Sequence, residues 1–154
     1  MIAKELYPFM QIYAVIIGLV VGSFLNVIIY RVPNNKSIIK PRSRCNGCGK
    51  QIAWYDNIPV LSYIALLAKC RNCKSPINVR YPLVEFICGM MALMLLNIYG
   101  PSYEFLVVVL LCFMLIAITF IDVDHFVIPN EFIIFGFIIS IISHTFNLLP
   151  ISIM

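Results

Sequence analysis

Four cysteines occur in two close pairs that could bind a metal ion. Cys45 and Cys48 form one C-x-x-C motif, Cys70 and Cys73 form another, and 21 residues separate the two motifs. Two such motifs can present four thiolates in the tetrahedral arrangement that zinc prefers. Four thiolates leave no position open for water or substrate, so the spacing predicts a structural zinc site. Two alternatives stay open, namely disulfide bonds and a redox protein that cycles its cysteine pairs.

Two carboxylates interrupt a long apolar run further along the chain, at Asp122 and Asp124. A pair of carboxylates can act as general acid and general base when like-charge proximity keeps one of them protonated. Residues two positions apart on a helix point to different sides, however, so these two do not make such a pair with each other. We expect one catalytic position here and its partner elsewhere. The alternative is two ordinary acids that end a helix at the water interface.

The composition is typical of a membrane protein. Hydrophobic residues make up 62% of the 154 residues and charged residues only 12%, far from the balance of a soluble domain. Each spanning helix needs about 20 apolar residues, and apolar segments lie at about 9–30, 83–99, 105–121 and 132–149. We therefore predict an all-α polytopic membrane protein with about four spans and one small tetracysteine loop domain.

The basic residues predict the orientation in the membrane. Ten of the 11 Lys and Arg residues lie within positions 31–80, and loops rich in these residues stay in the cytoplasm. The N-terminus then faces outward, and the acidic pair emerges on the same side as the cysteine loop. A reducing cytoplasm favours zinc over disulfides. Because the basic residues are spread among Cys, Pro and aromatic residues, we expect anionic membrane lipids as a partner and no nucleic acid.

Shorter features predict how the chain packs. The segment at 52–68 is too short to span a bilayer, and Trp54 with Tyr55 is typical of a segment anchored at the membrane interface; a docking surface for substrate is the alternative. Gly18 and Gly22 form a G-x-x-x-G motif that favours close helix packing, and Asn26, one turn later, can hydrogen-bond between helices. Glu85 is expected to open the second membrane helix, where a carboxylate suits the N-terminal end of the helix dipole.

Four motifs carry a family resemblance. They read G-S-F-L-N-V-I-I-Y-R-V-P at 22–33, W-Y-D-N-I-P at 54–59 between the cysteine pairs, R-Y-P-L-V-E at 80–85, and D-V-D-H-F-V-I-P-N at 122–130. In this order and spacing the chain resembles the type IV prepilin peptidases over nearly its whole length. The resemblance implies a membrane aspartic endopeptidase of the bacterial cytoplasmic membrane. It further implies cleavage of the leader peptide of type IV prepilins and pseudopilins on the cytoplasmic side.

The resemblance also implies roles for particular residues. The family places one catalytic aspartate in a D-x-D-x-x-x-I-P pattern, which assigns Asp122 as the catalytic position and Asp124 as the second choice. The family's other aspartate lies in a G-x-G-D motif that does not occur in these 154 residues. We therefore expect this chain to be inactive alone, with its partner carboxylate in a missing C-terminal half or in a second copy. The alternative function is a truncated, inactive relative that acts as a membrane binding or assembly component.

Members of the family commonly methylate the new N-terminus with S-adenosylmethionine after cleavage. The resemblance assigns this activity to the region of Glu85 and the cysteine domain. Where the family often has glycine, two residues before the third cysteine, this chain has Ala68. The expected parts of the chain are a first membrane helix at 1–33, a cytoplasmic zinc-binding domain at 34–81, and three further membrane helices at 82–154.

Overall fold

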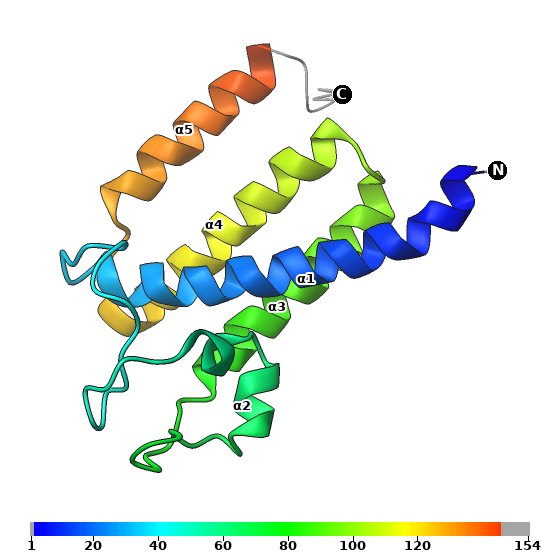
Figure 1. Ribbon diagram of the computed structural model, residues 1–154. Helices are drawn as coiled ribbons and strands as arrows, with labels where there is room; N and C mark the ends of the chain where they lie inside the picture. The colour runs from blue at the N-terminus through cyan, green and yellow to red at the C-terminus, as the bar shows by residue number, and fades with distance from the viewer. Residues whose placement is uncertain (1, 146–154) are drawn as a thin grey trace.

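The structure is helical throughout the part of the chain that it describes (Figure 1). The computed structural model describes residues 2–145. Its elements are α1 (Ile2–Arg31), the short helices η1 (Trp54–Asn57) and α2 (Leu61–Ala65), α3 (Arg80–Tyr99), α4 (Tyr103–His125) and α5 (Asn130–Thr145). Within these residues there is no β-strand, only two isolated bridges, Arg44 with Gln51 and Lys69 with Pro76. The predicted all-α membrane fold is confirmed.

In the described part of the chain, three helices are long and apolar enough to cross a membrane. They are Glu5–Arg31, Arg80–Tyr99 and Tyr103–His125, whereas the apolar part of α5, Asn130–Ser143, is shorter. The first three predicted spans therefore have counterparts, and the last residues of the fourth, predicted to reach 149, lie outside the described residues. One expected boundary differs, because α4 continues past Ile121 to His125. The two aspartates thus lie in the last turn of this helix, beyond the predicted end of the apolar span.

Small residues bring α1 and α3 into close contact. A Cβ atom added at Gly18 would lie 2.6 Å from the backbone oxygen of Cys88, and one added at Gly22 would lie 2.7 Å from the Cα of Glu85. Without an aqueous driving force, membrane helices associate through such tight van der Waals packing. Asn26 donates a hydrogen bond from Nδ2 to the backbone oxygen of Tyr81 at 3.0 Å. The close packing and the interhelical hydrogen bond predicted from the sequence are both confirmed.

The buried core lies where α1, α3 and α4 meet. Its members with an exposed fraction of zero are Ile29, Val84, Cys88, Ala117 and Ile121. Many large apolar side chains point away from this core, as expected for helices whose outer faces contact lipid. Ile121 immediately precedes Asp122, so the first aspartate is attached to a firmly packed point of the fold.

The helix bundle has two distinct ends, and side-chain hydrogen bonds join the helices at the first of them. Near the N-terminus, the Tyr7 hydroxyl donates to the backbone oxygen of Leu96 at 3.1 Å, and Gln11 Nε2 donates to Asn97 Oδ1 at 2.7 Å. At this end α3 turns into α4 through residues 100–102, and the Ser102 hydroxyl caps α4. The cysteine loop and the connection from α4 to α5 lie at the opposite end (Figure 1). As predicted, the cysteine loop and the acidic pair share one end of the molecule.

Candidate metal centre and active site

The four paired cysteines form one cluster, because each C-x-x-C motif closes into the same tight turn. In the first turn Cys45 N donates to Lys50 O, and in the second Cys70 N donates to Ser75 O. The residue after each pair has a left-handed backbone, with φ of 68° at Gly49 and 59° at Lys74. The two turns face each other, and the four sulfur atoms of Cys45, Cys48, Cys70 and Cys73 all lie within 4.8 Å of one another.

The cluster geometry fits a tetrahedral metal ion. Sulfur atoms bound to zinc at about 2.3 Å are roughly 3.8 Å apart in a tetrahedron, and the Sγ atoms of Cys45 and Cys73 are 3.7 Å apart. All four are free thiols and not disulfides. The cluster could therefore hold a metal ion with four sulfur ligands.

Ser75 tunes the thiols of the cluster. Its hydroxyl hydrogen-bonds the sulfur atoms of Cys73 at 3.1 Å and Cys45 at 3.6 Å. This hydrogen bond, helped by backbone N–H groups, lowers the pKa of Cys45 to about 6, and it also lowers the pKa of Cys73. The pKa of Cys48 rises to about 11, because desolvation and its thiol neighbours outweigh a favourable backbone hydrogen bond at Lys50. Neighbouring thiolates repel one another, and a bound cation would remove that repulsion.

An ion pair between Arg71 and Asp56 attaches the second cysteine turn to the short helix η1. Arg71 donates from Nε to Asp56 Oδ2 at 2.9 Å and from Nη2 to Asp56 Oδ1 at 2.6 Å. This two-point geometry is the strongest form of arginine–carboxylate contact. The Arg71 guanidinium holds the pKa of the Asp56 carboxyl below its usual range, and it also lies over the Tyr55 ring, 5.5 Å from the centroid.

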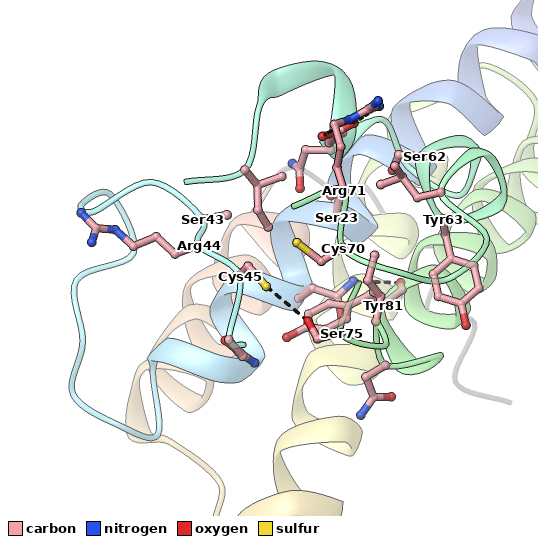
Figure 2. A pocket seen from close by; sticks show the side chains of 18 of the residues that line it. Ser23, Ser43, Arg44, Cys45, Ser62, Tyr63, Cys70, Arg71, Ser75 and Tyr81 are labelled. Atoms are coloured by element: carbon pink, nitrogen blue, oxygen red, sulfur yellow. Dashed lines mark hydrogen bonds and ion pairs between the residues drawn. The ribbon is translucent and has the colours of Figure 1, made fainter. Parts of the chain in front are cut away.

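A cavity of about 960 Å³ separates the cysteine loop from the ends of α1 and α3. Figure 2 shows Cys45, Cys70 and Ser75 along this cavity together with Tyr63 and Tyr81. The cavity is large enough for a cofactor-sized ligand. The cysteine cluster and a potential ligand site are therefore neighbours.

Two buried polar side chains from the helices also line the cavity. Asn26 is 4% exposed, and its Oδ1 has no hydrogen-bond partner among the described residues. Glu85 is 8% exposed and accepts a hydrogen bond from the Val60 N–H at 2.8 Å. The expectation that Glu85 serves the start of its helix was wrong, because α3 begins at Arg80 and Glu85 lies in the second turn. Glu85 and Val60 are 25 residues apart in the sequence, so no local sequence pattern predicts their hydrogen bond.

Asp122 and Asp124 lie at the C-terminal end of α4, and their side chains have different surroundings. Asp124 forms an ion pair with Arg80, which also lines the cavity. Asp122 is exposed and has no side-chain partner among the described residues. Carboxylates near a helix C-terminus are disfavoured by the helix dipole. Arg80 offsets this effect for Asp124 and leaves Asp122 as the unpaired carboxylate.

Comparisons with known proteins match most of the chain. A family model described as the bacterial peptidase A24 N-terminal domain matches residues 16–99. The prepilin leader peptidase/N-methyltransferase of Myxococcus xanthus is 46% identical over 134 residues, which cover 87% of this chain and 40% of that protein. The protein of the same name from Pseudomonas putida is 35% identical over 156 residues, covering 87% of this chain and 54% of its own length.

A further relative has a different name. The type 4 prepilin-like proteins leader peptide-processing enzyme of Escherichia coli is 36% identical over 141 residues, covering 80% of this chain and 52% of that protein. The chain thus spans about half the length of the curated relatives that it matches. No solved structure matches the chain.

Proposed function

Because this chain belongs to the bacterial A24 family of prepilin leader peptidases/N-methyltransferases, we propose that it supplies the metal-binding domain and one catalytic carboxylate of a membrane aspartic endopeptidase. The substrates are the leader peptides of type IV prepilins or pseudopilins, cut on the cytoplasmic side of the bacterial inner membrane. One observation carries the proposal: Asp122, the unpaired carboxylate, follows the buried Ile121 at the end of α4 that faces the cysteine loop.

Asp122 is the catalytic residue in this proposal. Peptide hydrolysis by carboxylates needs one group that removes a proton from water and a second, protonated group that polarises the scissile carbonyl. Asp122 performs one of these roles, and the second carboxylate comes from a C-terminal part of the enzyme or from a second copy. Asp124 does not act in its place, because Arg80 neutralises its charge and holds its side chain. Arg80 also keeps the cavity wall and the end of α4 together.

Zinc is the metal that we propose for the cysteine cluster, with a structural role. When bound, it would cross-link the two turns at Cys45, Cys48, Cys70 and Cys73. The loop at 34–81 buries few side chains of its own, and a structural zinc ion contributes folding energy to such small domains. The division into a first membrane helix, this domain and a following group of membrane helices stays a prediction.

Methyl transfer is the second activity that we propose, with the cavity beside the cysteine cluster as its site. S-adenosylmethionine would supply an electrophilic methyl group there. The unpaired Oδ1 of Asn26 is an acceptor for a ligand N–H or O–H group, and the Glu85 carboxylate offers negative charge to a cationic ligand. Ala68, at the position where the family often has glycine, has φ of 58°. The backbone thus takes the left-handed form that glycine adopts without strain.

The test is cleavage of a purified prepilin by the complete enzyme that carries these residues, reconstituted in lipid vesicles. Asp122→Asn should lower the cleavage rate by at least about 100-fold, the usual effect of losing a general acid or base. Membrane insertion and zinc content should stay unchanged. Asp124→Asn is the matched control and should retain most of the activity.

Two results would contradict the assignment. Full activity in Asp122→Asn together with loss in Asp124→Asn would transfer the catalytic role to Asp124. Binding of prepilin without cleavage by the unmodified enzyme would favour the assembly component over the peptidase. The intact mass of the natural protein tests the source of the second carboxylate, because a mass near the 17.5 kDa of this chain would leave only a second copy to supply it.

A further inference from the structure

The loop between the cysteine pairs carries a row of exposed apolar side chains. Leu61, Ile64 and Leu67 are 65%, 62% and 80% exposed, and Ile58 and Trp54 precede them at 40% and 73%. Leu61 and Ile64 belong to α2 and, three positions apart, lie on one side of this short helix, while Ile58 precedes the helix and Leu67 follows it. Contiguous exposed apolar surface of this kind marks contact with lipid or with another protein. We name residues 54–67 the α2 segment.

One hydrogen bond sets the depth of the α2 segment along α3. The Val60 N–H, at the start of α2, donates to Glu85 Oε2 at 2.8 Å. Glu85 lies five residues beyond Arg80, the first residue of the membrane-crossing helix α3, which corresponds to about 7.5 Å along the helix axis. The segment is therefore not extended away from the spans; it lies beside the second turn of one of them.

The chemistry of the flanking residues matches a bilayer surface. Trp54 and Tyr55 begin the segment, and rings of this type collect at membrane interfaces. Lys69 follows its end, and a basic side chain there can reach lipid phosphates, whereas Arg71 is engaged by Asp56. The order aromatic, apolar, basic is that of a segment which lies in the interface plane.

We propose that the apolar face of the α2 segment is inserted in the lipid bilayer surface. Insertion would hold the cavity and the cysteine cluster directly against the membrane, because Tyr63 and Leu66 of this segment also line the cavity. This proposal is independent of the peptidase proposal, since it concerns contact with lipid and needs no catalytic residue. Loss of either proposal would leave the other intact.

The chain itself contains the probe for a test, because Trp54 is its one tryptophan. We would reconstitute the zinc-loaded chain in phosphatidylcholine/phosphatidylglycerol vesicles with and without lipid brominated near the headgroup end of its acyl chains. Brominated lipid should lower Trp54 fluorescence by about two-fold or more, and aqueous iodide should quench it only weakly. Strong iodide quenching without bromine quenching would show a water-exposed loop and overturn the proposal. Quenching by neither would show a protein-covered face and overturn it as well.

A variant pair separates insertion from general loss of structure. Ile64→Asn adds a polar group to the apolar face and should raise iodide quenching of Trp54 and lower bromine quenching. Val79→Asn changes an apolar residue of similar exposure, 65%, outside the α2 segment, and should leave both unchanged. Zinc content of both variants reports whether the cysteine domain is folded. Equal quenching in the two variants with normal zinc content would contradict the insertion.

Discussion

Among single residues, Arg80 and Ser75 have roles that only the folded chain reveals. Arg80 neutralises Asp124 at the end of α4, and Ser75 hydrogen-bonds two thiols of the cysteine cluster. Both contacts depend on residues far apart in the sequence, 44 and 30 positions respectively for Arg80–Asp124 and Cys45–Ser75. The C-x-x-C motifs, in contrast, were readable because their ligand spacing is local. The cysteine ligands could therefore be predicted from the sequence, whereas the contacts of Arg80 and Ser75 could not.

Replacing Cys45 and Cys48 by Ser should release the metal and lower the yield of folded protein. The reason is that the loop loses half of its metal ligands, and with them the folding energy that metal binding contributes. Metal content by mass spectrometry and the folded fraction by size-exclusion chromatography in detergent check this. Cys112→Ser is the control, because Cys112 lies in α4 away from the cluster, and it should keep the metal. A normal folded yield without metal in the double variant would contradict a structural site.

Among the elements, the long apolar helices follow from sequence pattern, and the loop backbone does not. The hydrophobic runs predict α1, α3 and most of α4, but Leu67, Ala68 and Lys74 have left-handed φ angles of 51°, 58° and 59°. No residue type at these positions signals such a backbone, because glycine, its usual marker, is absent. The extension of α4 to His125 was also unforeseen, since Arg80 compensates an acid that would otherwise favour ending the helix earlier.

Ala68→Gly should stabilise the cysteine domain by up to about 1 kcal/mol, because glycine adopts a positive φ without the steric cost that Cβ imposes. Thermal unfolding of the purified protein in detergent measures the change. Ala65→Gly is the matched control of opposite sign. Ala65 lies in the helix α2, where glycine should destabilise by roughly 0.5–1 kcal/mol. Destabilisation by both substitutions would mean that the left-handed backbone at 68 is not a source of strain.

For the molecule as a whole, the contact between α1 and α3 fixes the position of the cavity end relative to the opposite end of the helix bundle. Gly18 and Gly22 let the helices approach until backbone touches backbone, so the cavity at one end depends on packing near the middle of the bundle. The glycine motif predicts the contact but not the partner helix. That choice requires complementary positions on α3, such as Gly89, where an added Cβ atom would lie 3.1 Å from the Leu19 side chain.

Gly18→Ala should destabilise the protein by about 1–3 kcal/mol, the usual cost of overpacking. Its Cβ would lie 2.6 Å from the Cys88 backbone oxygen, which cannot move aside without shifting α3. Gly136→Ala in α5 is the control, because the nearest atom there is the end of the flexible Met114 side chain at 3.3 Å. Thermal unfolding in detergent compares the two. An equal effect at both positions would contradict backbone contact between α1 and α3.

The short connection between α3 and α4 affects how the protein is made. Only residues 100–102 join two helices that are each long enough to span a bilayer, and Gly100 with φ of 62° allows the reversal. Such a helical hairpin can leave the ribosome and enter the bilayer as a pair, because neither helix has to wait for a polar segment to be translocated. The cysteine loop precedes this hairpin in the sequence, so all four paired cysteines are synthesised before the hairpin begins.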